Sequence, residues 1–483
     1  MSPLMLFSFV IAYFLILLAV AWYTGRNSNN DSFFIGNKNS NWMLVAFGMI
    51  GTSLSGVTFV SVPGDVGRNS FAYFQITLGY LLGYVVIAYV LLPLYYKLNL
   101  TSIYNYLSSR LGFKSYKTGA SFFILSRTLG ATARLYLVVK ILQDAILESF
   151  GVPFWVTTLI ILAMILVYTY EGGVKTIVWT DTLQTTCMLA GLVICVFYIL
   201  NIMGISFSDS LAAMEGNSYS KIFFTDPQSK NFFLKQILAG AFITITMTGM
   251  DQEMMQKNIS VKTLKDSQKN ILTLAFIMLV VILLFLFLGG LLHLYAHQLN
   301  VTATGDKLFP TIALQHMPPM VSVIFIIALI SALFPSADGA ITALTASFCI
   351  DILGMQRNTE WSDAEKKKIR QRVHLSFAGI FLLFVMIFKW VNDPSMIGVI
   401  LKVAGYTYGP LLGLFTFGIL TKRAVQDKLV PFVCIAAPII CFFIDKYQKS
   451  LFGGFEIGLE LLIINGLLTF IGLMAVSHKK AAA

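Results

Sequence analysis

Two acidic residues stand inside apolar stretches that are long enough to cross a membrane. Asp181 lies in "GGVKTIVWTDTLQ" and Asp338 lies in "LFPSADGA". A carboxylate in the hydrocarbon core of a bilayer is costly unless something pairs with it, so such a residue indicates a functional site. Carboxylate, hydroxyl and backbone carbonyl oxygens are hard ligands that suit a hard cation. For Asp181 the alternative is a helix cap or a buried hydrogen bond near the inner surface.

Basic residues also occupy an apolar stretch, residues 117–148. Arg127 and Arg134 are seven residues apart, so on a helix they share one face about two turns apart. Arg134 is expected near the bilayer midplane, where it either neutralises an aspartate or binds an anionic substrate. Intramembrane charges usually find protein partners, which favours structural pairing. Lys140 and Asp144, four residues apart near the outer end, are expected to pair.

Two further apolar stretches carry small and polar residues where a membrane helix would normally continue. The first reads "FGMIGTSLSGVTFVSVPG" and the second reads "ITITMTGMDQEMMQK". In transporters built from inverted repeats, unwound backbone at mid-membrane exposes carbonyls and amides that bind substrate. Close helix packing through small residues is the alternative for "GTSLSG". The second interruption, five spans later, favours a site, and it makes Asp251 and Gln252 candidate substrate contacts.

A third interruption is expected in "LFPSADGA". Pro335 removes a backbone donor and kinks a helix. Gly339 permits close packing or a local bend. We therefore expect the helix to open beside Asp338.

Membrane-spanning helices must position all these residues. The chain is 57% hydrophobic and 12% charged with a mean hydropathy of +0.78, whereas soluble domains carry about 25% charged residues. The sequence therefore predicts an all-α polytopic membrane protein. Apolar segments of spanning length give about thirteen transmembrane helices, near residues 3–24, 42–66, 71–96, 117–148, 153–170, 173–202, 231–256, 265–298, 318–352, 371–392, 395–420, 427–446 and 455–477.

The two interrupted stretches with paired polar residues are the second and the seventh span. A repeat of five helices, spans 2–6 and 7–11, would make each the first helix of its half, and an odd number of helices inverts the second half. We expect an extra N-terminal span with the first cytoplasmic loop, a first repeat, an extracellular loop, a second repeat, and two C-terminal spans with a tail. These divisions fall at residues 1–40, 41–202, 203–230, 231–424 and 425–483.

Lysines and arginines are unevenly distributed between alternate loops. One set of loops holds 22 of them and the other holds 8. Because cytoplasmic loops carry the excess, we expect a multi-pass protein of the cell (inner) membrane with its N-terminus outside and its C-terminus in the cytoplasm. The net charge of +11 is then a topology signal and does not indicate nucleic-acid binding. The richer set includes Arg26, Lys38, Lys175, Lys257 and Lys480.

Other kinds of site and of protein are disfavoured. The five cysteines lie in apolar runs without a CxxC pair, which argues against disulfides and zinc. No loop has room for a soluble ATPase domain and no P-loop sequence occurs, so transport must use a gradient or be passive. The five histidines form no HExxH motif, and we do not expect an enzyme. A channel, or a sensor built on a transporter fold, is the alternative function.

Four stretches in order, "WTDTLQ", "GMDQEMMQK", "SADGAITALTASFCIDI" and "GYTYGPLLGLFTFGILTKR", resemble the sodium:solute symporter family. The resemblance runs from about Asn41 to Arg423, and two other stretches are most similar to its bacterial sialic acid branch. It implies the LeuT-like inverted-repeat fold, with Na⁺ as the coupling ion. It also implies uptake of a small polar solute by alternating access: a sugar, a polyol, sialic acid or another small organic anion. We expect the protein to function as a monomer.

The resemblance implies a main sodium site of backbone carbonyls and hydroxyls at Gly51, Leu54, Ala332 and Ser336. A second hydroxyl position is Pro335 here, which has no side-chain oxygen. Proline frees the carbonyl four residues earlier, that of Ser331, whose carbonyl or hydroxyl could serve instead.

Some relatives bind a second sodium ion with the "WTD" aspartate and hydroxyls just after the first site. These positions are Asp181, Asp338 and Gly339 here, so an aspartate stands where a serine often does. We expect Asp181 and Asp338 to lie close together and to share a cation, a proton or an arginine, because two ionised carboxylates with nothing between them repel each other.

The substrate-facing positions that the resemblance implies all carry hydroxyls: Ser53, Ser55, Thr58, Tyr73 and Thr77. The arginine that grips the carboxylate in the sialic acid branch matches Gly130 here, and Arg127 and Arg134 flank it by close to one helical turn. We include Arg134 among the candidate substrate contacts. Sialic acid is compatible with this set, and a neutral sugar, a polyol or another small anion fits equally.

Overall fold

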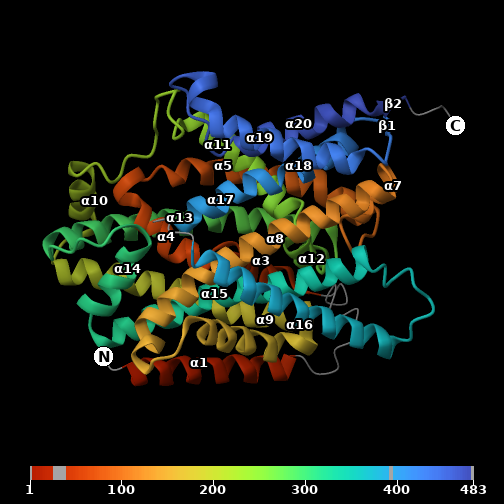
Figure 1. The fold of residues 1–483 in the computed structure, drawn as a ribbon. Coiled ribbons are helices and arrows are strands. Elements are labelled where there is room, and N and C mark those ends of the chain that lie inside the picture. Colours follow the sequence, from red (N-terminus) through yellow and green to blue (C-terminus); the bar gives the residue numbers. More distant parts are fainter. Residues whose placement is uncertain (1–2, 25–39, 391–394, 480–483) are drawn as a thin grey trace.

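The chain folds into a bundle of long helices with its two termini at opposite ends (Figure 1). The computed structural model describes residues 3–24, 40–390 and 395–479, and side chains among these except at residues 170–175. Arg26, Lys38 and Lys480 lie outside the described residues, as does the side chain of Lys175. The predicted all-α polytopic architecture is confirmed. The helices are α1 (Pro3–Thr24), α3 (Trp42–Ser53), α4 (Gly56–Asn69), α5 (Tyr73–Val86), α6 (Leu92–Lys97), α7 (Asn105–Arg110), α8 (Phe113–Leu142), α9 (Phe154–Met203), α10 (Phe207–Gly216), α11 (Phe233–Thr244), α12 (Gln252–Ile259), α13 (Leu264–Gln298), α14 (Leu308–Thr311), α15 (Pro319–Ser347), α16 (Asp363–Phe388), α17 (Met396–Thr407), α18 (Gly409–Leu420), α19 (Val430–Phe452) and α20 (Leu461–Ala475).

The spans agree with the hydropathy pattern, although their exact number stays a prediction. Among the described residues, eight helices are long and apolar enough to cross a membrane, or up to eleven if each bent pair counts as one span. Two shorter apolar helical stretches, Phe154–Thr169 and Leu461–Ala475, lie where two other spans were expected. Helix α9 contains two expected spans in 50 continuous residues, about 75 Å if straight, which is more than twice the hydrocarbon thickness of about 30 Å.

Three spans are broken. Helices α3 and α4 meet at 56°, and the segment Phe233–Gly249 meets α12 at 65°. Both breaks lie where small and polar residues interrupt the apolar pattern. The third break, of 46° between α17 and α18, was not predicted, although Pro410 follows it directly and cannot donate a backbone hydrogen bond into α17.

The expected opening of "LFPSADGA" is wrong. Helix α15 runs without interruption from Pro319 to Ser347 with Pro335 inside it. Every side chain from Ala328 to Ser347 is buried, and α15 packs against α1, α3, α4, α8, α9 and α16. Pro335 removes one hydrogen bond from the helix. The packing of α15 on all sides keeps the helix continuous despite this loss.

The connecting segments form two groups at opposite ends of the bundle, as the alternation of spans predicts. At the end that carries the C-terminus, hydrogen bonds or strand pairing join Ser40 to Ser260, Lys114 to Asp427, Arg110 to Gly418, and β1 (Ala424–Val425) to β2 (Ser477–His478). At the other end, hydrogen bonds join Phe71 to Lys221 and Met396 to Asp306. The grouping leaves open which end faces the cytoplasm.

Candidate functional site

A cavity of about 90 Å³ lies beside the break between α3 and α4. Five of the predicted substrate contacts line it: Ser53, Ser55, Thr58, Tyr73 and Arg134. The hydroxyl of Ser53 is buried and has no hydrogen-bond partner among the described residues. Because buried polar groups are normally hydrogen-bonded, this hydroxyl indicates a place for a polar ligand.

The cavity adjoins a wider vestibule of about 450 Å³. The two share Tyr73, Ile397 and Leu401 as lining residues. The vestibule is also lined by Asp65 and Arg68 at the end of α4, so it belongs to the end of the bundle away from the C-terminus. The cavity therefore lies next to a space that belongs to that end of the bundle.

The two arginines of α8 have different surroundings. Arg127 is 4% exposed and forms an ion pair with Glu253, with the Asp251 carboxylate 3.9 Å from its second guanidinium nitrogen. Arg134 has no hydrogen bond or ion pair within the part of the chain that the structure describes, and it faces the cavity. The preference for structural pairing is therefore wrong for Arg134.

The predicted pair of Lys140 and Asp144 is confirmed, with 3.1 Å between Nζ and the carboxylate oxygen. Both side chains are about half exposed, at the C-terminal end of α8. Neither residue lines the cavity, so this exposed pair is a useful control for the buried arginines of the same helix.

Tyr80 also lines the cavity, although it was not among the predicted substrate contacts. The hydroxyls of Tyr73 and Tyr80, one helical repeat apart on α5, lie 3.2 Å from each other. Arg134 lines the same cavity as both tyrosines. Tyr73 and Tyr80 are seven residues apart, as Arg127 and Arg134 are, so each pair lies on one face of its helix. This spacing could have identified Tyr80 from the sequence.

Three predicted substrate contacts do not line the cavity. The Thr77 hydroxyl donates to the Tyr73 carbonyl of its own helix. The Asp251 side chain caps α12 and accepts a hydrogen bond from the Tyr408 hydroxyl at 2.9 Å. Gln252 binds the backbone of residues 101 and 103. These side chains have their partners within the protein, and we assign them structural roles.

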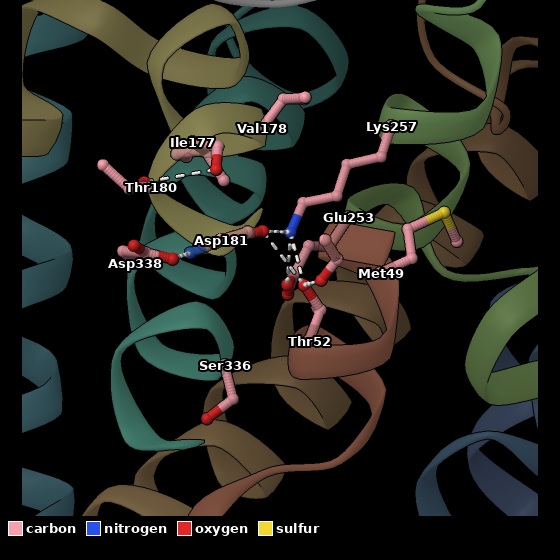
Figure 2. Close-up of polar contacts among 12 residues, drawn as sticks. Met49, Thr52, Ile177, Val178, Thr180, Asp181, Glu253, Lys257, Ser336 and Asp338 are labelled. Atoms are coloured by element: carbon pink, nitrogen blue, oxygen red, sulfur yellow. Dashed lines mark hydrogen bonds and ion pairs between the residues drawn. The ribbon is translucent and has the colours of Figure 1, made fainter. Parts of the chain in front are cut away.

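A buried charge cluster lies between α3, α9 and α12, beside the α3–α4 break (Figure 2). The Lys257 ammonium lies 2.7 Å from the Asp181 carboxylate and 2.6 Å from the Thr52 hydroxyl. Glu253, one turn earlier on α12, lies 3.9 Å from Lys257 and binds Arg127 with its other oxygen. Lys257 was predicted to be a cytoplasmic loop residue, which is wrong, because α12 continues past it and its side chain is 3% exposed.

Asp338 has partners of its own. Its carboxylate accepts hydrogen bonds from the Tyr168 hydroxyl at 2.6 Å and from the Gly339 amide at 2.5 Å. Asp338 lies close to Asp181 in the same cluster (Figure 2), so the carboxylates lie in one region as expected. The expected sharing of one partner is not what the hydrogen bonds show, because Lys257 bonds to Asp181 and Tyr168 bonds to Asp338.

One position predicted for the main sodium site, Gly51, lies where α3, α9 and α15 pack together. Leu54 has a non-helical backbone at the end of α3, with φ −93° and ψ 81°, and Gly51 lies one turn earlier. A Cβ on Gly51 would collide with the Thr185 hydroxyl and would lie 3.5 Å from the Pro335 ring. Thr185 is fully buried, and its hydroxyl has no partner among the described residues.

The hydroxyls on α15 are less available than the resemblance implied. The Ser336 hydroxyl donates to the Leu333 carbonyl at 2.8 Å. The Ser331 hydroxyl, a suggested substitute ligand, donates to Tyr13 of α1 at 2.6 Å and so faces away from the break. The Thr185 hydroxyl, unpaired among the described residues, and the Pro335 ring thus both lie beside Gly51, and "WTDTLQTT" contained Thr185 four residues after Asp181.

Comparisons with known proteins agree with this arrangement. The profile of the sodium:solute symporter family matches residues 33–427. This chain belongs to the sodium:solute symporter family. The family defines its class of activity, which is the movement of a solute coupled to sodium, and the resemblance seen in the sequence is confirmed.

Individual relatives are distant but match along most of their length. The sodium/sialic acid symporter SiaT of Proteus mirabilis is 24% identical over 457 residues, which is 90% of this chain and 88% of the relative. The human sodium/iodide cotransporter is 24% identical over 82% of this chain and 62% of its own. The names of these two relatives state different solutes, sialic acid and iodide, so family membership does not identify the substrate.

Solved structures show that the fold is shared. A Na⁺-coupled sialic acid symporter in a substrate-bound outward-open state superposes with a TM-score of 0.83 at 20% identity, covering 97% of both chains. The nucleobase-cation symporter Mhp1 in a closed conformation superposes with a TM-score of 0.57 at 13% identity, covering 93% of this chain and 95% of that chain. The protein is a symporter with the LeuT-like fold.

Proposed function

We propose that this symporter takes up a small organic anion that carries hydroxyl groups, and that Arg134 binds its carboxylate. The guanidinium of Arg134 lines the cavity and has no ion-pair partner among the described residues, and this observation carries the proposal. A guanidinium offers a planar fork of donors that matches a carboxylate, and a charged group at a partly buried position calls for a counter-charge. The hydroxyls of Ser53, Ser55 and Thr58 suit the hydroxyl groups of such a solute.

Sialic acid is the first substrate to test, because it is a hydroxylated carboxylic acid. The relatives from Proteus mirabilis and Aliivibrio fischeri are both named as sodium/sialic acid symporters. A neutral sugar or a polyol would use the same hydroxyls and would leave Arg134 without a counter-charge.

The proposed sodium position couples the ion to the solute through the unwound backbone between α3 and α4. The carbonyls of Gly51 and Leu54 would bind sodium together with the Ala332 carbonyl and the hydroxyls of Ser336 and Thr185. Residues 53 and 55 of the same break line the cavity. An ion that fixes the unwound backbone therefore also fixes the substrate hydroxyls, which gives the two ligands a mutual gain in affinity.

The proposed route begins at the vestibule and follows alternating access. We assign the vestibule end, with the N-terminus, to the outside of the cell (inner) membrane, and the end with the C-terminus to the cytoplasm. The basic residues near the C-terminal end support this assignment. Because the cavity and the proposed sodium position lie within one chain, we propose that the monomer is the functional unit.

The test is uptake into proteoliposomes. Radiolabelled N-acetylneuraminate, a neutral hexose and a polyol are compared with an inward sodium gradient and with choline in place of sodium. Arg134→Gln should raise the half-saturating concentration of the anion about 10- to 100-fold, because a hydrogen bond to a charged group contributes roughly 1.5–3 kcal/mol. Lys140→Gln removes an exposed charge from the same helix and is the matched control. Preferred uptake of the neutral solutes with an unchanged Arg134→Gln variant would contradict the proposal.

A further inference from the structure

The ammonium of Lys257 occupies a position that oxygen ligands would otherwise offer to a metal cation. It lies within hydrogen-bond distance of the Asp181 carboxylate and the Thr52 hydroxyl, and the Glu253 carboxylate lies 3.9 Å away. These groups come from α9, α3 and α12, so they converge on one point (Figure 2). An ammonium has three donors and no acceptor, and two of the three are used by the first two contacts.

Two cations cannot share this position. At a separation of 4 Å, two unit charges repel by about 4 kcal/mol even at an effective dielectric constant of 20. Lys257 is 3% exposed and is held between α3 and α9, so its ammonium cannot swing into water to make room. The oxygen atoms nearest to Lys257 therefore do not fit an added sodium ion.

Lys257 and Arg127 each pair with one carboxylate of the cluster, whereas Asp338 bonds to the Tyr168 hydroxyl. Lys257 faces Asp181, and Arg127 faces Glu253, whose carboxylate lies between the two cations. The hydrogen bonds of Lys257 also join α12, which follows the second helix break, to α3, which precedes the first. A fixed cation at this place can hold the two broken helices against α9 in the way that a bound ion would.

We propose that Lys257 is a tethered cation that replaces an exchangeable sodium ion at Asp181, so that the protein binds one sodium ion, at the carbonyl position beside Leu54. This proposal rests on the sodium coupling of the family and on the sodium position proposed above. It removes Asp181 from the predicted sodium ligands and explains why a lysine stands in the middle of a membrane protein.

The wild-type protein supplies the first measurement. Equilibrium binding of ²²Na⁺ to the purified protein in nanodiscs, without organic substrate, should saturate at one ion per chain with a Hill coefficient near 1. Two bound ions would overturn the tethered-cation proposal. No saturable binding would instead overturn the sodium position beside Leu54 and, with it, the count of one.

Variants of the pair supply the second measurement. Lys257→Met should open Asp181 to a second ion and raise the stoichiometry to two with a Hill coefficient above 1. Lys257→Arg keeps the cation, and Lys257→Met combined with Asp181→Asn removes the carboxylate, so both should bind one ion. A folded Lys257→Met variant that still binds one ion would overturn the proposal. If that variant does not fold, the counts for the wild type and for Lys257→Arg decide.

Discussion

At the residue scale, the function depends on which buried charges already have partners. Lys257 and Arg127 are neutralised by carboxylates within the protein, whereas Arg134 faces the cavity with no carboxylate partner in the part of the chain that the structure describes. Removing one member of a buried ion pair typically costs about 3–5 kcal/mol, because the other charge is left buried and alone. The paired residues are therefore part of the scaffold, and the unpaired arginine is available to a ligand.

Thr185 belongs to the same scale, because it offers the oxygen that Pro335 lacks. Thr185→Val keeps the shape of the side chain and removes the hydroxyl, so the half-saturating sodium concentration should rise about 5- to 10-fold for a loss of roughly 1–1.4 kcal/mol. Sodium-dependent uptake into proteoliposomes measures this shift. Thr186→Val is the matched control, because the neighbouring hydroxyl is exposed and bonds to its own helix.

A second variant separates a ligand role of Thr185 from a packing role. Pro335→Ser in the Thr185→Val background places a hydroxyl on α15 next to the same gap and should recover part of the lost sodium affinity. An unchanged sodium requirement in Thr185→Val would exclude this hydroxyl from the sodium position.

At the element scale, the helix breaks could be predicted where polarity and small side chains coincide. Both predicted breaks contain glycine together with hydroxyls or an Asp-Gln pair, which lower the cost of exposing backbone in a membrane. Pro335 gave a false signal, because the tertiary contacts of α15 on all sides outweigh a local effect. Lys257 was misassigned for the opposite reason. Lys257 lies at the end of an apolar run, where a charged residue usually belongs to a loop. Its partner Asp181 on α9 is 76 positions earlier, so the pattern around Lys257 does not show that the residue is buried.

The packing of the segment around Asp306 against α4 and the start of α17 makes the stability of the protein depend on pH. The Asp306 carboxylate accepts a hydrogen bond from the Met396 amide at the start of α17, and burial raises its pKa from 3.8 to about 6. Asp65 raises this pKa further and Arg68 lowers it. The folded state therefore holds a proton that the unfolded state has released, and stability falls as the pH rises from about 4 to about 6.

Asp306→Asn should remove this loss. Its melting temperature in detergent should match that of the wild type near pH 4 and exceed it above pH 6. A pKa difference of about two units sets an upper limit of about 3 kcal/mol for the gain. Asp226→Asn, in an exposed part of the same end, is the control and should show no such pH-dependent difference. A constant difference between Asp306→Asn and the wild type at all pH values would point to packing instead of ionisation.

At the scale of the whole molecule, the sequence predicted which loops share an end but not which partners they find. Hydropathy fixes the alternation of spans, and the hydrogen bonds between loops at each end agree with it. The vestibule, in contrast, is formed by α4, α5, α17 and segments near residues 230 and 458, which hydropathy alone cannot bring together. The orientation of the protein in the membrane therefore decides whether the proposed uptake is possible, because uptake requires the vestibule to face the outside.

Thiol labelling tests this orientation directly. Asp144→Cys places a thiol at a half-exposed position at the vestibule end, and Lys428→Cys places one at an exposed position at the other end. Four of the five native cysteines are buried and the fifth is partly buried, so background labelling should be low. A membrane-impermeant maleimide should label Asp144→Cys in intact cells and should label Lys428→Cys only after permeabilisation. The reverse pattern would place the vestibule in the cytoplasm, and the cavity seen in the structure would then be loaded from inside.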